Sequence, residues 1–524
     1  MPPRAVASPP LNAGSDFLHL DIGQAPAGGR AAWLADRLRR AIADGVTPVG
    51  SRLPATRVLA ADLGVSRGVV VEAYQRLVED GHVAGRGRAG TVVVAAPSPA
   101  SAGSATHGST SAGWTLTAPR SSGRAPADGD RIGGAATPAP PAAADPAGLF
   151  APAPGSDIFD AVRTAPARID LTPGVPDLAA FPRAAWLRAE KAVLRRLAAP
   201  DLGYGDPCGT PALRRAVAGW LARTRGITVD PTEVIITTGV SQALGLLAEA
   251  LRHDGPTTVG VEDPGSLGVR QHLDNLRVET VPIPVDAAGL RVDALAASGV
   301  PAVMLTPAHQ FPTGVVLDGD RRRQLADWAR AGGLVIEDDY DAEHRYDRPP
   351  VPALRATLPE QVCYTGSVSK LLAPALRLGW LLVPRRHRDA VVAAKRTADL
   401  GNAVLPQLVL AELITDGALE RQLRLLRRRH VRRRDAMISA LARHLPDATV
   451  HGAAAGLHLT VTLDGEVADT ELAAATLARG VKVQPLSWHC RRPYPPGLVL
   501  GYAANSASAI EEGIATIAAA RRRP

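Results

Sequence analysis

The chain has 524 residues, a formal net charge of +8 and a hydrophobic content of 46%, enough apolar residues to build packed cores. This length exceeds what one ordinary core serves, so we expect two or more domains. The three cysteines are odd in number and far apart, which argues against a disulfide framework and a metal site and fits a reducing compartment. We find neither a signal-peptide pattern nor a membrane-spanning apolar run, and therefore expect a cytoplasmic protein without a membrane partner.

The basic residues are almost all arginines. Only four of the 59 basic residues are lysines, namely Lys191, Lys370, Lys395 and Lys482. The net positive charge is compatible with a polyanionic partner, although charge alone is weak evidence. Because arginine keeps its proton and supplies no free amine, each remaining lysine is a candidate for amine chemistry.

Residues 12–95 are predicted to form a winged helix-turn-helix. Apolar residues recur at helical spacing from Trp33 to Ile42, and a second helix covers about residues 57–63. A third helix begins at Ser66, a good N-cap, and runs to Asp80. Two β-rich segments, 83–84 and 91–94, flank a glycine-rich stretch and indicate a hairpin.

In such a domain the third helix enters the major groove, and the hairpin forms a wing over the minor groove or the phosphates. Arg67, at the start of that helix, is expected to reach a base edge or a phosphate. A helical protein-interaction module is the alternative. The predicted DNA contacts are Arg52, Arg57, Ser66, Arg67, Val69, Arg86 and Arg88.

The sequences GSRLP at 50–54, RVLA at 57–60 and LGVSR at 63–67 resemble the GntR family of regulators, over about residues 33–94. Two positions depart from that pattern. Ala55 stands where the family usually has serine, and residues 68–70 are GVV where it has a threonine. Val69 is therefore expected to touch a thymine methyl group instead.

Residues 96–165 are rich in Ala, Pro, Gly and Ser, so they are predicted to form a disordered linker. The most biased stretch ends near residue 157, and a flexible coil of about 60 residues spans on the order of 45 Å. We interpret this segment as a tether between two domains.

From residue 166 to 524, apolar β segments alternate with helical stretches, which predicts an α/β domain with a mainly parallel sheet. The sequence EDDY at 337–340 follows an apolar strand, so its acids are expected at the edge where α/β sheets bind ligands. The sequence SVSK ends at Lys370, and Arg377 follows. Pyridoxal phosphate needs these groups: an amine for a Schiff base, a carboxylate for the ring nitrogen, and hydroxyls with an arginine for the phosphate.

This region, about residues 169–517, is similar to fold-type I aminotransferases and to the MocR/GabR regulators, which fuse such a domain to a GntR-type winged helix. The resemblance implies a large sheet followed by a small C-terminal α+β subdomain. It also implies that Lys370 forms the Schiff base, that Asp338 pairs with the pyridinium nitrogen, and that Tyr340 bonds the ring hydroxyl. Its implied phosphate ligands are Ser367, Ser369, Arg377, Gly239, Val240, Ser241 and, from a neighbouring subunit of a homodimer, Tyr204.

The sequence PAHQFPTG at 307–314 is similar to the turn that covers the cofactor in MocR proteins. We nevertheless expect His309 to be a loop histidine without a catalytic role. The arginine-rich run at 421–434 admits a DNA-binding interpretation, but a solvated helix face is preferred.

Three positions depart from the aminotransferase pattern. Ser266 replaces the aromatic residue that usually covers the pyridine ring, and Phe311 replaces an asparagine that bonds the ring hydroxyl. The late strand GLVLGY at 497–502 has no arginine for a substrate carboxylate, and Arg491 and Arg492 are the nearby substitutes. Without a bidentate partner a carboxylate loses orientation as well as binding energy, so full transamination is doubtful.

The sequence therefore predicts a transcriptional regulator whose large domain senses a small molecule and whose winged helix binds promoter DNA. Two effectors remain open: an amino compound that reacts with the cofactor on Lys370, or pyridoxal phosphate itself, which the missing arginine favours. A working aminotransferase that carries a DNA anchor, and a degenerate domain without a cofactor, are the alternatives.

Overall fold

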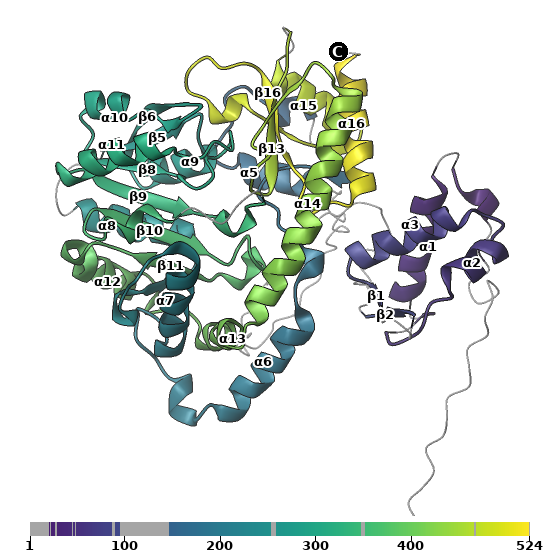
Figure 1. The fold of residues 1–524 in the computed structure, drawn as a ribbon, viewed down its shortest axis with the longest axis horizontal. Helices are drawn as coiled ribbons and strands as arrows, with labels where there is room; N and C mark the ends of the chain where they lie inside the picture. Colours follow the sequence, from purple (N-terminus) through teal and green to yellow (C-terminus); the bar gives the residue numbers. More distant parts are fainter. Residues whose placement is uncertain are drawn as a thin grey trace, which may run out of the picture.

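The computed structural model describes residues 20, 22–26, 29–44, 46–47, 49–85, 90–94, 146–252, 258–346, 352–465 and 468–522. A small part precedes residue 95 and a large part begins at residue 146 (Figure 1). The predicted wing residues Arg86 and Arg88, and the linker up to residue 145, lie outside the described residues. Among the described helices, none is long and apolar enough to cross a membrane.

The small part has the three helices and the hairpin that the sequence predicts. Helices α1 (Arg30–Ala43), α2 (Thr56–Asp62) and α3 (Arg67–Glu79) are followed by β1 (Val83–Gly85), which pairs antiparallel with β2 (Thr91–Val93). Their inward faces form one apolar core that includes Leu34, Leu38, Leu59, Val70 and Leu77. This core fixes α3 relative to the other two helices, and leaves the start of α3 exposed.

An eight-stranded sheet forms the centre of the large part, in the order β4-β11-β10-β9-β8-β5-β6-β7. The strands β10, β9, β8, β5 and β6 run parallel, while β11, β4 and β7 enter through antiparallel pairs. The mainly parallel sheet predicted from the sequence is therefore confirmed. The strand bounds are β4 (Ile235–Thr237), β5 (Thr258–Asp263), β6 (Glu279–Asp286), β7 (Gly289–Leu290), β8 (Ala302–Leu305), β9 (Leu334–Asp339), β10 (Val362–Ser367) and β11 (Gly379–Leu382).

Helices cover both faces of this sheet, because successive side chains of each central strand point to opposite faces. In β9, Leu334 and Ile336 pack in the cluster that contains residues of α8, α9 and α12, whereas Val335 packs with residues of α10 and α11. The helices are α6 (Arg183–Arg196), α7 (Pro211–Arg225), α8 (Val240–Arg252), α9 (Leu267–Asn275), α10 (Val292–Ser298), α11 (Gly319–Arg330), α12 (Arg385–Asp399) and α13 (Val404–Thr415).

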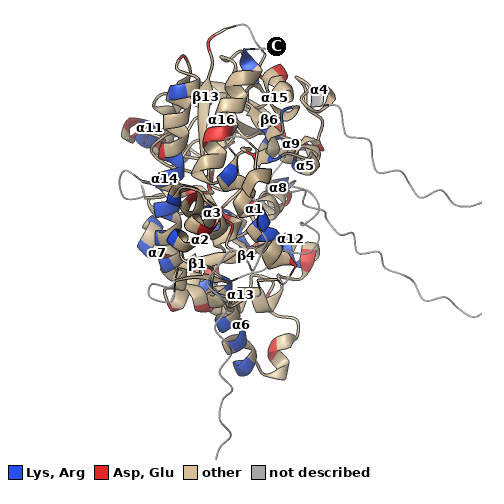
Figure 2. Cartoon of the chain, turned by 90° about the vertical axis from the view of Figure 1, so that its right-hand side faces the viewer, with Lys and Arg blue, Asp and Glu red and all other residues tan. Residues whose placement is uncertain are grey.

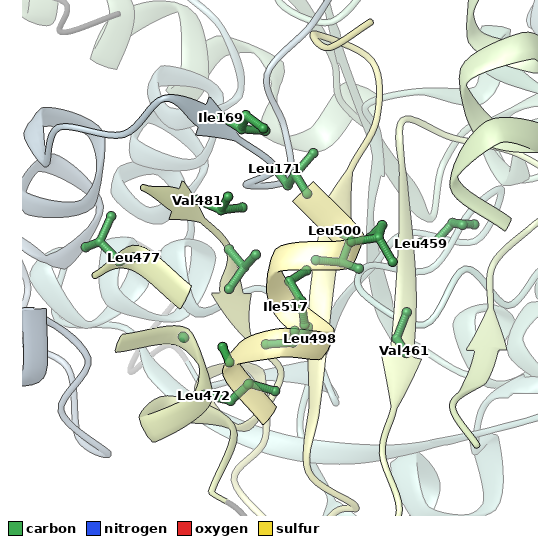
Figure 3. Close-up of a cluster of buried hydrophobic side chains, with 14 of the residues drawn as sticks. Ile169, Leu171, Leu459, Val461, Leu472, Leu477, Val481, Leu498, Leu500 and Ile517 are labelled. Carbon is green, nitrogen blue, oxygen red and sulfur yellow. The ribbon is translucent and has the colours of Figure 1, made fainter. Parts of the chain in front are cut away.

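The C-terminal subdomain has an antiparallel sheet in the order β12-β13-β16-β15, and a parallel pair that joins β14 to β3 from the start of the domain. Figure 3 shows its core, where Ile169 and Leu171 meet Val481, Leu498 and Leu500. The chain therefore enters the large part through this subdomain. Its elements are β3 (Ile169–Asp170), α14 (Ala418–His444), β12 (Thr449–His451), β13 (His458–Thr462), α15 (Asp469–Leu477), β14 (Val481–Lys482), β15 (Gln484–Pro485), β16 (Gly497–Gly501) and α16 (Ala507–Arg521).

Residues 146–165 belong to this subdomain, although the sequence placed them in the linker. They contain α4 (Pro146–Leu149) and α5 (Ile158–Thr164), and Phe150 and Ile158 are buried in the subdomain core. Phe150 stacks on Trp488 with ring centroids 5.5 Å apart. A few apolar side chains are enough to dock this segment, and the Ala- and Pro-rich composition around them hid that contact.

The arginine-rich run at 421–434 lies in α14, the long helix that reaches the C-terminal subdomain, and Figure 2 shows basic residues on α6, α7 and α12 as well. Arg429 and Arg433 form ion pairs with the buried Asp177, at 2.8 and 2.9 Å. The Arg434 guanidinium lies over the ring of Tyr346. The predicted solvated face is therefore only part of the run: Arg421, Arg424, Arg428 and Arg432 are exposed, whereas Arg429 and Arg433 bind within the domain. The short 3-10 helices are η2 (Ile22–Gln24), η5 (Leu178–Ala180), η6 (Ala199–Leu202), η7 (Pro231–Glu233), η8 (Ala342–His344), η9 (Leu354–Ala356), η10 (Pro374–Leu376) and η11 (Ser487–His489).

Candidate cofactor and DNA-binding sites

The residues predicted for cofactor chemistry gather at the carboxyl ends of β9 and β10. These strands are parallel neighbours, and Asp338 of β9 is in register with Thr365 of β10. Ser367 is the last residue of β10, and Lys370 lies in the turn that follows. Because parallel strands end at the same sheet edge, the folding of two local segments brings this acid and this amine into one region.

Lys370 is half-buried, and its Nζ donates a hydrogen bond to the carbonyl oxygen of Gly174 at 2.5 Å. Burial lowers the pKa of this amine, while the charges of Asp341 and Asp338 act in the opposite direction. An amine with a lowered pKa is more often unprotonated, and that form attacks an aldehyde. The structure therefore gives Lys370 the environment that a Schiff-base lysine needs.

Asp338 is buried, and its Oδ1 has no hydrogen-bond partner among the described residues. Burial, and then the neighbouring Asp339 and Asp341, raise the pKa of the Asp338 carboxyl to about 7. A buried carboxylate oxygen without a partner is costly, and a cationic ring N–H would satisfy both its charge and its hydrogen bond. On this observation the site fits a protonated pyridine ring.

Four of the predicted phosphate ligands, Gly239, Val240, Ser241 and Arg377, lie around the start of α8. Gly239, with φ +114°, precedes this helix, and a Cβ placed on it would lie 3.6 Å from Nη2 of Arg377. The guanidinium of Arg377 is therefore beside the first turn, whose N–H groups at Val240 and Ser241 have no partner within the helix. Free N–H groups at a helix start, together with a guanidinium, are the kind of groups that bind a phosphate. Ser367 and Ser369 lie in the segment that leads from β10 to Lys370.

Tyr340 directly follows β9, and its hydroxyl lies 3.0 Å from Nδ1 of His309. The same Nδ1 lies 2.8 Å from Oδ2 of Asp341. His309 and Asp341 are both 1% exposed. The sequence predicted a loop histidine without a role and did not single out Asp341, because only the folding of the loop after β9 brings these three side chains together.

Two of the departures from the aminotransferase pattern are visible in this region. Ser266 is the N-cap of α9, where its hydroxyl accepts a hydrogen bond from the N–H of Val269 at 3.3 Å. The Phe311 ring stands edge-on to Tyr340, at 6.3 Å between centroids. Phe311 has no side-chain donor, so an apolar ring lies beside Tyr340 where similar enzymes have an asparagine.

The two arginines that the sequence offered for a substrate carboxylate are engaged elsewhere. The guanidinium of Arg491 donates to the backbone and side-chain oxygens of Thr280, at 2.9 and 2.8 Å. Arg492 pairs with Oδ2 of Asp263 at 2.9 Å. Strand β16 is buried and apolar along its whole length. At these positions the structure thus has no arginine that is available to bind a substrate carboxylate.

Tyr204 is 94% exposed and projects away from its own domain, in a stretch that also exposes Leu202. Leu400 is also exposed, and the backbone of the adjacent Gly401 lies near Pro207, where a Cβ on Gly401 would lie 3.3 Å from the Cα of Pro207. Leu202, Tyr204 and Leu400 are thus large hydrophobic side chains left in contact with solvent.

The predicted DNA contacts that the structure describes lie mostly on exposed positions. Arg52, Arg57, Ser66 and Arg67 are exposed, whereas Val69 is half-buried. Ser66 is the N-cap of α3, as predicted, but its hydroxyl makes no capping bond. Val71, which the sequence did not single out, is 44% exposed and lies one helical turn after Arg67, on the same face.

Two family profiles match the chain: "Aminotransferase class I and II" over residues 168–517 and "Bacterial regulatory proteins, gntR family" over residues 31–93. The chain is 31% identical over 491 residues to the probable rhizopine catabolism regulatory protein MocR of Rhizobium meliloti, covering 93% of this chain and 92% of that protein. It is 31% identical over 458 residues to the pyridoxine biosynthesis transcriptional regulator PdxR of Corynebacterium glutamicum, covering 87% of each.

Solved aminotransferases share the fold of the large part. The kynurenine aminotransferase of Pyrococcus horikoshii superposes with a TM-score of 0.64 at 27% identity, over 70% of this chain and 93% of that one. An archaeal alanine:glyoxylate aminotransferase superposes with a TM-score of 0.65 at 26% identity, over 72% and 98%. These matches agree with the fold of the large part described above.

Proposed function

Because the chain belongs to the regulators that join a GntR-type winged helix to an aminotransferase class I and II domain, we propose that pyridoxal phosphate bound at Lys370 controls its binding to promoter DNA. The chain is a transcriptional regulator whose large domain is of the pyridoxal-phosphate-dependent aminotransferase type. The observation that carries the proposal is the buried Asp338, whose unpaired Oδ1 lies at the same sheet edge as the Lys370 amine.

The cofactor, when bound, supplies an aldehyde that captures amines and a ring that withdraws electrons. In the proposed site Lys370 would supply the amine, and Asp338 would pair with the protonated ring nitrogen. Arg377 and the first turn of α8 would hold the phosphate, with Ser367 and Ser369 as further donors. Tyr340 would be the partner of the ring hydroxyl.

We favour pyridoxal phosphate itself as the effector, because no arginine is available for a substrate carboxylate at the positions where one is expected. Arg491 and Arg492 are bound to Thr280 and Asp263, and β16 is apolar. The relative named for pyridoxine biosynthesis supports this choice. The relative named for rhizopine catabolism keeps an amino compound as the alternative effector. Either ligand must favour one domain arrangement over another for DNA binding to change.

The regulator is proposed to act as a cytoplasmic homodimer, with Tyr204 of each chain completing the phosphate site of the other. The exposed Tyr204 and its apolar neighbours support this arrangement. Two winged helices on long tethers would then bind two half-sites and gain avidity.

A DNA-binding titration tests the proposal. Fragments of the promoter region beside the gene for this chain are titrated with the full-length protein, with and without pyridoxal phosphate or candidate amines. The expected result is a several-fold change in affinity with pyridoxal phosphate alone, and no change for Lys370→Ala. A response that requires an added amine selects the other effector, and equal affinity under all conditions contradicts control by the cofactor site.

An active aminotransferase that carries a DNA-binding domain is the second candidate function, and the fold that the large part shares with solved aminotransferases supports it. A single-turnover experiment separates the two. The loaded protein is mixed with amino acids, and the formation of pyridoxamine phosphate is followed. Steady turnover with a common amino donor would overturn the view that the chain is only a regulator.

A further inference from the structure

Lys395 is a buried lysine that the proposed site does not use. It lies near the end of α12 and is 0% exposed. Its Nζ lies 2.9 and 3.0 Å from the two carboxylate oxygens of Asp399, and 2.8 Å from Oδ1 of Asn402. It also lies 3.4 Å from Oε1 of Gln242, in α8. The N–H donors of this amine therefore have acceptors within the protein, which allows a charged group to be buried here.

The side chain of Gln242 joins this cluster to the start of α8. Its Oε1 accepts a hydrogen bond from the backbone N–H of Thr238 at 2.8 Å, and its Nε2 donates to Oδ2 of Asp399 at 2.6 Å. Gln242 is the third residue of α8, a position from which a glutamine side chain can bond a backbone N–H that precedes the helix. One amide group thus ties the turn before α8 to the end of α12.

Lys395 and Asp399 determine which end of the Gln242 amide faces Thr238. A carboxylate only accepts hydrogen bonds, and an ammonium only donates them. If the amide were rotated by half a turn, its NH₂ group would face the Lys395 ammonium and the Thr238 N–H, and its oxygen would face the Asp399 carboxylate. All three contacts would then be unfavourable. The two charged groups therefore hold the amide oxygen toward Thr238.

This bond restrains the turn that leads into α8. Gly239 follows Thr238 with φ +114°, a backbone conformation that glycine adopts readily, so the turn needs restraint from its surroundings. The bond to Gln242 holds the backbone before this glycine. The Ala243 N–H, which donates to the Gly239 carbonyl at 3.1 Å, holds the backbone after it. The first N–H groups of α8, which have no partner within the helix, then keep one direction beside the Arg377 guanidinium.

We propose that Gln242 and Lys395 are positioning residues for the phosphate group of the cofactor. Gln242 holds the turn whose N–H groups receive the phosphate, and Lys395, with Asp399, holds the amide of Gln242. This inference rests on the proposed function, since it needs pyridoxal phosphate at the start of α8. Pyridoxal has the same aldehyde and ring but no phosphate, so its binding should not depend on these residues. The ratio of the two dissociation constants therefore separates this role from a general effect on folding.

Absorbance titrations of the full-length protein with pyridoxal phosphate and with pyridoxal measure this ratio. Gln242→Met removes the acceptor of the Thr238 N–H at nearly the same side-chain length. Its dissociation constant for pyridoxal phosphate should rise about 3- to 10-fold, while that for pyridoxal stays within about twofold. Lys395→Met removes the ammonium that orients the amide, and should raise the first constant about 2- to 5-fold. Because Lys395 acts through Gln242, the double variant should show no more loss than Gln242→Met alone.

Lys482→Met is the matched control. Lys482 is also a buried lysine that pairs with an aspartate, since it is 2% exposed and its Nζ lies 3.3 Å from Asp170, but it lies in β14 of the C-terminal subdomain. Its ratio should equal that of the unmodified protein, even where both affinities fall. The melting temperature of each variant reports folding separately, and Gln242→Met decides the test where Lys395→Met does not fold.

A Gln242→Met protein with the ratio of the unmodified chain overturns the inference alone. Equal losses of affinity for pyridoxal phosphate and pyridoxal overturn it too, because they show a general effect on the domain. The same result follows if Lys482→Met changes the ratio as much as Lys395→Met does. An unmodified chain that binds neither ligand, or binds both equally well, contradicts the proposed cofactor site, and this inference with it.

Discussion

The amine of Lys370 and the carbonyl of Gly174 are joined by a hydrogen bond, with 2.5 Å between nitrogen and oxygen. Gly174 follows β3, which pairs with β14 of the C-terminal subdomain, whereas Lys370 follows β10 of the large sheet. The bond therefore connects the two halves of the domain at the amine that the proposed function uses.

Gly174→Ala should weaken the binding of pyridoxal phosphate. Gly174 has φ +84°, and a Cβ there would lie 3.2 Å from Nζ of Lys370, so the amine has to shift. We expect the dissociation constant to rise roughly 5- to 30-fold, equivalent to about 1–2 kcal/mol, in an absorbance titration. Gly299→Ala is the control, because Gly299 has φ +68° but no atom within 4 Å of its Cβ. Equal losses of affinity in both variants would show that backbone strain alone is responsible.

Asp338→Asn should stabilise the cofactor-free protein at alkaline pH. The pKa of Asp338 is about 7 in the folded protein, against about 3.9 in an unfolded chain. Between these values the folded state binds more protons than the unfolded state, so this group lowers stability as the pH rises from about 4 to about 7.

The Asp338→Asn variant removes the loss of folding stability that the ionised Asp338 causes. Its free energy of unfolding should exceed that of the unmodified protein by about 1–3 kcal/mol at pH 8 and by little at pH 4, as measured by urea unfolding without cofactor. Its affinity for pyridoxal phosphate should fall at least about 10-fold, since the ring nitrogen loses its anionic partner. A variant that is less stable at pH 8 but binds the cofactor normally would contradict both the buried charge and its assigned partner.

Tyr204→Ala should lower cofactor affinity through the neighbouring subunit. Tyr204 is 94% exposed, so its own domain gains little from it. When Tyr204→Ala and Lys370→Ala chains are mixed, each heterodimer should regain one complete site, made of one chain's lysine and the other chain's tyrosine. Absorbance titration of the mixture should recover tight binding that neither variant shows alone. The absence of recovery in a mixture that forms heterodimers would exclude the shared site.

Arg67→Ala should weaken DNA binding through a lost phosphate or base contact. Arg67 is the first residue of α3 and is exposed. A lost phosphate contact should reduce the slope of log affinity against log salt by about 1, whereas a lost base contact costs about 1–3 kcal/mol at one position of the site. Arg330→Ala is the control, because Arg330 pairs with Asp327 on α11 of the large domain. Similar DNA binding by the Arg67 and Arg330 variants would remove α3 from the interface.

Val71→Ala gives a complementary measurement. Val71 is 44% exposed on the same face as Arg67 and carries no charge. Its loss should reduce discrimination between thymine-containing and other sites without changing the salt slope. A change in slope alone would mean that the variant disturbs the helix rather than a base contact.

The sequence alone was sufficient to predict a structural feature wherever the evidence for that feature lies in consecutive residues. Helical spacing and an N-cap at Ser66 predicted the bounds of α3 to within a residue or two. An apolar strand followed by EDDY, and SVSK ending at Lys370, predicted which side chains stand at the sheet edge. Both are local patterns, and parallel strands always place their carboxyl ends together.

Other features were decided by contacts between distant segments. Residues 146–165 have the composition of a linker, but Phe150 stacks on Trp488 of the C-terminal subdomain. Arg491 was offered as a partner for a substrate carboxylate, but its guanidinium donates to Thr280. His309 was predicted to be a loop histidine without a catalytic role, and the fold buries it beside Tyr340 and Asp341.

The sequence by itself therefore determined the two domain types and the chemical groups at the cofactor site, because periodicity, capping and strand-end motifs are properties of neighbouring residues. Only the tertiary structure decided which of those groups have partners. A polar side chain becomes oriented when burial removes water and leaves it one or two possible partners, and burial depends on how segments far apart in the chain pack together.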